Sequence, residues 1–200
     1  SITAYEPELA KELATHYNSP LFNSIQKLSD QGEISIGMGM PTLSADGIHI
    51  SMLIFQPLMA RTVYSKQLLH TDELAYFSAG KEQRFLDIKG KKIAVGICYE
   101  TLQREHFIQA KKGRADIYIA SVAKPLHGIQ KAYQHFPRIA NEFNTPVLMA
   151  NSIGFCDNFL AGGQSAVWNQ KGELLQQLDG QNQGLLLYNS ELESAQVHLL

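Results

Sequence analysis

The stretch KKIAVGICYE, residues 91–100, decides the fold class. Its apolar centre has the length of a buried strand, and this apolar run stops at Cys98. Two later stretches, DIYIASVA (116–123) and TPVLMANS (145–152), have the same character. Segments with helical spacing separate the three. Strand, helix, strand, helix and strand in this order predict parallel strands covered by helices, which is an α/β fold.

Both helical segments contain a residue that ends or breaks helices. The first is predicted over 101–115, where Gly113 closes the helix. The second is predicted over 128–144, and Pro137 is expected to interrupt it because proline has no backbone N–H. After these helices, strand and turn patterns return over 162–178 and 183–189.

The first part of the chain predicts helices followed by antiparallel strands. Apolar residues recur at helical spacing after an acidic start, which favours the positive end of a helix dipole. The turn sequence SADG joins two of the strands as a hairpin and places Lys66 at the end of the third. The expected helices cover 6–18 and 21–28, and the expected strands cover 33–40, 47–56 and 60–66. Without a repeat or a linker, residues 1–200 are expected to form a single domain.

The composition is that of a globular protein, with 44% hydrophobic and 18% charged residues. With 17 Lys and Arg against 19 Asp and Glu, the chain offers no basic surface for nucleic acid or an anionic membrane. Its apolar stretches are too short to span a bilayer, and no leader opens the chain at Ser1. Cys98 and Cys156 form no disulfide framework. We therefore expect a cytoplasmic protein that binds neither nucleic acid nor membrane.

Cys98 has two interpretations on position alone. Free cysteine packs well as a small core residue, but side chains at the carboxyl ends of parallel strands also line functional crevices. A nucleophilic thiol needs a nearby cation or base, because its pKa of about 8.5 leaves little thiolate at neutral pH. Lys66 and Glu73 could supply these groups, although each alone is typical of a surface residue. A Cys-His dyad with His127 or His135 is the rival arrangement, and no metal-ligand spacing occurs.

Six short blocks, taken in order, resemble the successive motifs of the nitrilase, or carbon-nitrogen hydrolase, superfamily. They extend from the first third of the chain nearly to its end, and their order is specific although each block is short. The blocks are YSKQLL, DELAYFSAG, KKIAVGICYE, YIASVA, LMANSIGF and GGQSAVWNQKGELL.

The resemblance implies a four-layer αββα sandwich that dimerises. It also implies hydrolysis or transfer at the non-peptide carbon–nitrogen bond of a small amide, carbamoyl or nitrile substrate through a cysteine thioester, with water as the second substrate and without metal or organic cofactor. Cys98 matches the nucleophile of the family's Glu-Lys-Cys triad, Lys66 its lysine, and Glu73 an additional carboxylate. Tyr99 matches the position whose N–H contributes to the oxyanion hole, and Asn151 lies in a block that helps form the substrate site.

The match departs from the family at its front. SITAYEP resembles the text that follows the family's general-base glutamate, so the alignment places that base two residues before Ser1. The strand, helix and strand that open the fold would also precede Ser1, which makes the sandwich incomplete at its N-terminus. Glu8, in EPELA, offers a second match to the base but falls at a predicted helix start, where a glutamate needs no catalytic explanation.

Two further residues could read the substrate. Lys124 and His127 follow the strand that leads into the family's substrate pocket, where a lysine could pair with a substrate carboxylate; a solvated loop lysine is the simpler interpretation. Two other classes of function stay open. One is a catalytically silent binding or scaffold protein, and the other is a cysteine hydrolase of the nucleophile-elbow type, which needs small residues where this chain has Tyr99 and Glu100.

Overall fold

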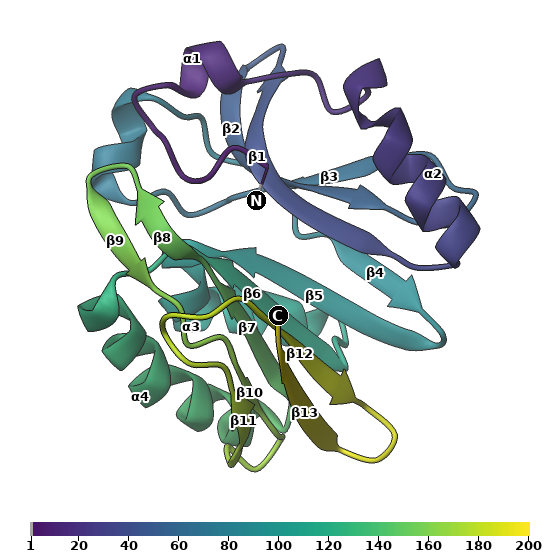
Figure 1. The fold of residues 1–200 in the computed structure, drawn as a ribbon, viewed down its shortest axis with the longest axis vertical. Helices are drawn as coiled ribbons and strands as arrows, with labels where there is room; N and C mark the ends of the chain where they lie inside the picture. The colour runs from purple at the N-terminus through teal and green to yellow at the C-terminus, as the bar shows by residue number, and fades with distance from the viewer. Residues whose placement is uncertain (1) are drawn as a thin grey trace. The chain divides into compact units, whose positions relative to one another are not determined.

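The computed structural model describes residues 2–200. It divides the chain into two compact units, Ser1–Gln83 and Arg84–Leu200, whose elements are labelled in Figure 1. The prediction of one domain over residues 1–200 stays a prediction.

The first unit is built on a three-stranded antiparallel sheet in the order β1-β2-β3. The pairing of Ser44 with Gly47 leaves a two-residue turn, so the predicted hairpin and meander are confirmed. Gly47 adopts φ +131°, a conformation that glycine accepts without strain. A small core of Phe22, Met40, Leu53 and Phe55 packs one face of the sheet. The strands are β1 (Ile36–Ser44), β2 (Gly47–Phe55) and β3 (Thr62–Ser65).

The helices of the first unit are shorter or later than predicted. The helix expected over 6–18 is reduced to α1 (Ala10–Leu13), because the chain turns extended at Ala14 and Thr15 bridges to the edge of β1. The helix expected over 21–28 is formed by η1 (Pro20–Phe22) and α2 (Asn23–Gly32). A short helix η2 (Thr71–Ala75) follows β3 and carries one of the candidate residues.

The second unit has a six-stranded mixed sheet in the order β11-β10-β7-β6-β5-β4. Its centre, β5-β6-β7, is parallel, as the alternation of strands and helices predicts. The pairings of β4 with β5, of β7 with β10 and of β10 with β11 are antiparallel. The strands are β4 (Phe85–Ile88), β5 (Lys91–Ile97), β6 (Ile117–Val122), β7 (Val147–Asn151), β10 (Ala166–Trp168) and β11 (Leu174–Gln177).

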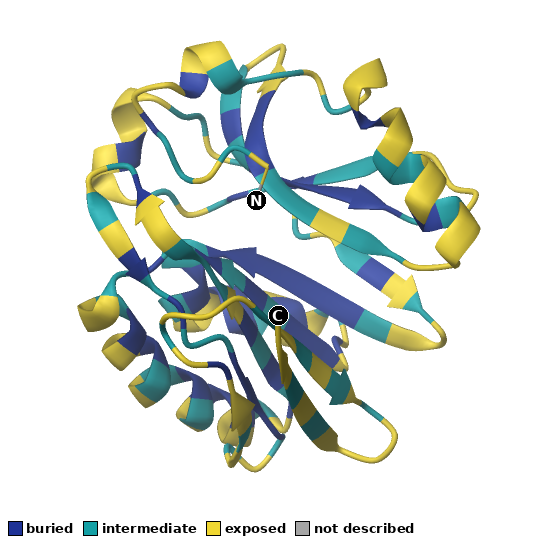
Figure 2. Ribbon diagram, in the orientation of Figure 1, coloured by how far each residue is buried: buried dark blue, intermediate teal, exposed yellow. Residues whose placement is uncertain are grey.

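Helices form the two crossovers and bury a shared core against the sheet. The first crossover contains η3 (Cys98–Leu102) and α3 (Arg104–Lys112), and the second is α4 (Leu126–Phe143). Figure 2 shows β5 buried along most of its length, while α4 buries one face and exposes the other. The core includes Phe107, Tyr118, Phe136, Met149 and Trp168.

Pro137 does not interrupt α4, so that expectation is wrong. A proline inside a helix removes one backbone hydrogen bond. The buried side chains of Ala132, Phe136, Ile139 and Ala140 lie on one face of α4 and pack into the core. This tertiary packing keeps the helix continuous despite the lost bond.

Two hairpins complete the second unit. They are β8 (Ile153–Cys156) with β9 (Phe159–Gly162), and β12 (Gly184–Asn189) with β13 (Ser194–Leu199). The strand predicted over 183–189 is confirmed, whereas β8, β9 and β13 were not expected from the sequence. Within residues 2–200, no helix has both the length and the apolar character needed to cross a bilayer.

Candidate active site

The residues predicted for the site fall in both units. Lys66 and Glu73 belong to the first unit, and the others belong to the second. Within the first unit the structure brings Lys66 and Glu73 into direct contact. Within the second it brings Cys98, Lys124 and Asn151 into one neighbourhood through the loop after β6. Tyr99 follows Cys98 directly, and His127 lies in the first turn of α4.

Lys66 and Glu73 form a fully buried ion pair. The ammonium of Lys66 donates to both carboxylate oxygens of Glu73, each at 2.6 Å, and the two side chains are 0% and 2% exposed. Glu73 also accepts hydrogen bonds from the Tyr5 hydroxyl at 3.1 Å and from the His70 N–H at 2.6 Å. Buried charges are costly unless they are paired and hydrogen-bonded. The interpretation of Lys66 as a surface lysine is therefore wrong.

Local structure fixes both members of this pair. Lys66 directly follows β3, and its backbone N–H and C=O bond to Ile50 and Gly80. A Cβ on Gly80 would lie 2.1 Å from the carbonyl oxygen of Ser65, so only glycine allows this close approach. Glu73 is the third residue of η2, and its carboxylate reaches back to the N–H of His70 as in a capping box.

Cys98 lies on a sharp turn at the carboxyl end of β5. Its φ of +49° is in the left-handed region, which costs a non-glycine residue on the order of 1–3 kcal/mol. Strained residues of this kind concentrate at functional sites. Cys98 is half-buried as a residue, and its Sγ lies 3.8 Å from the carbonyl oxygen of Ala123. The structure thus has a tight strand-to-helix turn at this cysteine, even though Tyr99 and Glu100 are not small.

The turn rests on buried polar residues that the sequence did not identify as functional. Glu100, His106 and Tyr118 are all 3% exposed or less. Glu100 accepts a hydrogen bond from the N–H of Ile97 at 2.8 Å, and the Thr101 hydroxyl donates to the carbonyl of Cys98 at 2.6 Å. The charged residue in a largely apolar stretch, ICYE, is the only signal in the sequence for this arrangement.

Asn151 organises the loop that carries Lys124. Its side-chain oxygen accepts the N–H of Lys124 at 2.8 Å, and its amide donates to the carbonyls of Lys124 and Gly163 at 3.2 and 2.7 Å. These contacts show a residue that holds two loops together. Lys124 is buried, with 5% exposure, so the expectation of a solvated loop cation is wrong. His127 is exposed.

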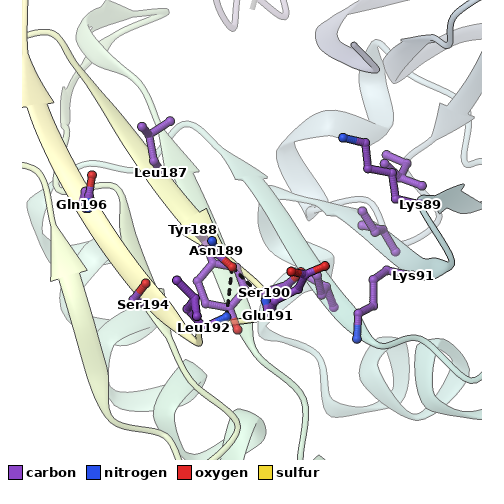
Figure 3. Close-up of a pocket in the computed structure, with 13 residues that line it drawn as sticks. Lys89, Lys91, Leu187, Tyr188, Asn189, Ser190, Glu191, Leu192, Ser194 and Gln196 are labelled. Atoms are coloured by element: carbon purple, nitrogen blue, oxygen red, sulfur yellow. Dashed lines mark hydrogen bonds between the residues drawn. The ribbon is translucent and has the colours of Figure 1, made fainter. Parts of the chain in front are cut away.

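A cavity of about 550 Å³ lies elsewhere in the second unit and contains none of the predicted site residues (Figure 3). Its lining extends along β5 as far as Ile93, whereas Cys98 follows the end of that strand. Five residues of extended strand span about 17 Å, so the cavity lies away from the thiol. Asn189, on the wall of the cavity, accepts hydrogen bonds from the N–H groups of Glu191 and Leu192 at 2.9 and 3.0 Å.

Among residues 2–200, no cluster of His, Cys, Asp and Glu side chains could hold a metal ion.

Comparison with known proteins gives a family match and several similar folds. The family model described as carbon-nitrogen hydrolase matches residues 1–197. Comparison with curated proteins gave no match. A CN-hydrolase superfamily protein from Xanthomonas campestris, solved with an arsenic adduct in its active site, is 18% identical with a TM-score of 0.80; the alignment covers 98% of this chain and 73% of that one.

Two other solved structures show the same fold. Nit3 from Saccharomyces cerevisiae, a member of the nitrilase superfamily, is 20% identical with a TM-score of 0.79, over 90% of this chain and 69% of that one. A mutant amidase from Nesterenkonia sp. AN1, whose active-site cysteine has undergone Michael addition of acrylamide, is 17% identical with a TM-score of 0.76, over 89% and 72%. The predicted α/β fold of the nitrilase type is confirmed.

Proposed function

Because the chain belongs to the carbon-nitrogen hydrolase family, we propose that it hydrolyses a non-peptide carbon–nitrogen bond of a small amide-like substrate through a thioester on Cys98. The observation that carries this proposal is the half-buried residue Cys98 on a left-handed turn at the end of β5. A core cysteine would be buried on unstrained backbone, as Cys156 is on β8.

In the first half of the reaction, the general base takes the proton of the Cys98 thiol, and the resulting thiolate attacks the substrate carbonyl carbon. A carbon–sulfur bond forms, and the carbonyl electrons move to the oxygen. We assign Lys66 and the N–H of Tyr99 to this oxyanion, because donors aimed at developing charge give a large rate term, of about 3 kcal/mol each. The carbon–nitrogen bond then breaks, and the nitrogen leaves as an amine after protonation by the general base in its acid form.

In the second half, water attacks the thioester and releases the carboxylic acid and the free thiol. The general base takes a proton from this water and gives one to the thiolate. We assign this base to the glutamate that the family resemblance places just before Ser1. The alternative base, Glu8, is exposed, whereas Lys66 and Glu73 are buried. This difference supports the glutamate before Ser1 over Glu8. The scheme requires neither metal nor organic cofactor.

Glu73 has a supporting role in this scheme. Its two oxygens each lie 2.6 Å from the Lys66 nitrogen, and two other donors fix the carboxylate. A lysine held in this way keeps one position, so its ammonium needs no reorganisation when the oxyanion forms. The pairing supports a role for Lys66 in the chemistry.

We extend the proposal to substrate recognition. Lys124 is buried and its backbone is held by Asn151, so it could present a fixed charge to a substrate carboxylate. His127, on the exposed first turn of α4, would then contact the distal end of the substrate. We also propose, from the family resemblance, that the protein forms a homodimer and, from its two free cysteines, that it acts in the cytoplasm.

Ammonia release from two amides of similar size tests the proposal. Butyramide carries no charge, and succinamate carries a carboxylate in place of the terminal methyl group. We expect turnover of at least one, its loss in Cys98→Ala, and its retention in Cys156→Ala, which is the matched control for the second cysteine. Lys124→Met should lower any preference for succinamate. Turnover that survives Cys98→Ala would refute the mechanism, and no turnover with either amide would favour a binding protein.

A further inference from the structure

A chain of buried polar side chains lies beneath the turn that carries Cys98. The carboxylate of Glu100 accepts the N–H of Ile97 at 2.8 Å and lies 3.6 Å from Nε2 of His106. Nδ1 of His106 lies 2.7 Å from the hydroxyl of Tyr118. These residues come from η3, α3 and β6, so the chain ties three elements to the end of β5.

The direction of the hydrogen bonds follows from the protonation states. Burial, and the nearby charge of Glu100, raise the pKa of Tyr118 well above its ordinary value, so its hydroxyl keeps its proton and donates to Nδ1 of His106. Burial lowers the pKa of His106, which favours the neutral ring. A neutral ring that accepts at Nδ1 carries its proton on Nε2, facing Glu100. The Tyr118 hydroxyl therefore donates to His106, and the Nε2–H of His106 and the N–H of Ile97 face the Glu100 carboxylate.

The backbone leaves room for this arrangement at one position. A Cβ on Gly96, near the end of β5, would lie 2.2 Å from the Tyr118 hydroxyl and 3.1 Å from Cε1 of His106. Gly96 thus lies against Tyr118 and His106, and the next residue, Ile97, bonds to Glu100 just before the turn at Cys98. Burying a carboxylate is expensive, and apolar side chains would fill this space at a lower cost. Packing alone therefore does not explain why a carboxylate is buried here.

We propose that Glu100 is a positioning residue: its carboxylate, held by His106 and Tyr118, fixes the turn that aims the Cys98 thiol and the Tyr99 N–H at the substrate. This inference rests on the proposed function of Cys98. The bond to Ile97 closes the turn on one side of Cys98, and the Thr101 hydroxyl closes it on the other. Without the carboxylate, a left-handed cysteine would relax towards an ordinary conformation.

Three substitutions separate this role from simple structural support. Glu100→Ala removes the acceptor, whereas Glu100→Gln keeps an oxygen for the Ile97 N–H. Glu105→Gln changes an exposed glutamate on the adjoining helix and is the matched control. The assay measures KM and kcat with butyramide or succinamate, and kcat is expressed per folded molecule, counted from the amplitude of the urea-unfolding transition followed by the fluorescence of Trp168. Because molecules that are already misfolded do not contribute to this amplitude, a merely structural role would leave kcat unchanged.

We expect Glu100→Ala to lower kcat about 100-fold with KM within about twofold, since displacing a reacting group by about 1 Å has effects of this size. Glu100→Gln should recover about tenfold of this loss, and Glu105→Gln should match the native protein. If Glu100→Ala yields no folded protein, Tyr118→Phe decides: it removes the donor to His106, and we expect kcat to fall about tenfold. If folded Glu100→Ala has the kcat of the native protein, the inference is overturned. If Glu100→Ala does not fold, an unchanged kcat in Tyr118→Phe overturns it.

A second measurement tests the role of Glu100 even if the protein does not hydrolyse these amides. Iodoacetamide alkylation of Cys98, resolved from Cys156 by peptide mass, needs no amide substrate. If the native protein turns over neither amide, the proposed function fails, and the alkylation rates decide the positioning role alone. A Cys98 rate at least about tenfold lower in Glu100→Ala than in native protein supports the role. Equal rates overturn it.

Discussion

The buried pair of Lys66 and Glu73 makes a quantitative prediction about stability and activity. Glu73→Gln replaces a carboxylate that accepts four hydrogen bonds, two from Lys66 and one each from Tyr5 and His70, by an amide with a single acceptor oxygen. It also leaves the Lys66 ammonium buried without a counter-charge. Losing one partner of a buried pair costs about 3–5 kcal/mol, and we expect the free energy of unfolding of the first unit to fall by this amount.

A double variant shows what the pair is for. In Lys66→Met/Glu73→Leu, both charges are gone and two apolar side chains of similar volume fill the space. Because replacing a buried pair in this way is often neutral or stabilising, we expect most of the lost stability to return. Turnover should nevertheless be absent, since no ammonium remains for the oxyanion. Such a result would show that the pair is kept for chemistry.

Urea unfolding followed by two signals measures the effect. Trp168, the single tryptophan, lies in the second unit, so its fluorescence reports on that unit. Far-UV circular dichroism reports on both units. Asp72→Asn, an exposed change in the same short helix, is the control and should alter stability by less than about 1 kcal/mol. A loss below about 1 kcal/mol in Glu73→Gln, or a double variant as unstable as the single one, would show that the buried pair does not contribute in this way.

Three further predictions follow from the structure. Lys66→Arg keeps the charge but replaces a compact ammonium by a planar fork, so kcat with butyramide or succinamate should fall at least about 100-fold; near-native turnover would show that Lys66 has no catalytic role. Gly96→Ala places a Cβ 2.2 Å from the Tyr118 hydroxyl and should cost about 1–3 kcal/mol in urea unfolding; an unchanged midpoint would contradict the packing. Burial lowers the pKa values of His106 and His135 below the ordinary 6.5, so the unfolded chain binds more protons and the free energy of unfolding should decrease as the pH falls below about 6.5. Unfolding curves at pH 7.5, 6.5 and 5.5 test this. His135→Asn should reduce the dependence of the free energy of unfolding on pH, and an unchanged dependence would count against the contribution of His135.

Much of the fold could be predicted because local patterns and tertiary structure agree. The β5-β6-β7 region combines strand-length apolar runs with helical spacing between them, and the turn at 44–47 fixes the β1-β2 hairpin. Prediction failed where tertiary contacts outweighed local preference. Pro137 favours a break that the buried face of α4 overcomes. The apolar spacing near Leu13 favours a longer helix than the one that forms before Thr15 joins the edge of β1.

The candidate site could be predicted in part, and the reason differs from residue to residue. Cys98 was identifiable as a candidate because it ends a predicted strand, but its position left a core residue equally open, and only the family resemblance favoured the nucleophile. The burial of Lys66 was not, because no local pattern shows that Glu73, seven residues later, will meet it in the interior. The burial of Lys124 depends in the same way on contacts that only the folded chain makes, such as the bonds from Asn151. Glu100 was overlooked because a single carboxylate after an apolar run usually indicates the start of a loop.

The proposed mechanism requires Cys98 to carry the acyl group during turnover. Protein turning over butyramide or succinamate can be quenched in acid and digested, and the mass of the peptide that contains Cys98 can be measured. We expect this peptide to gain the mass of the acyl group, the Cys156 peptide to stay unchanged, and Cys98→Ala to show neither the adduct nor turnover. Steady turnover by Cys98→Ala, or an acyl group found only on another residue, would contradict it.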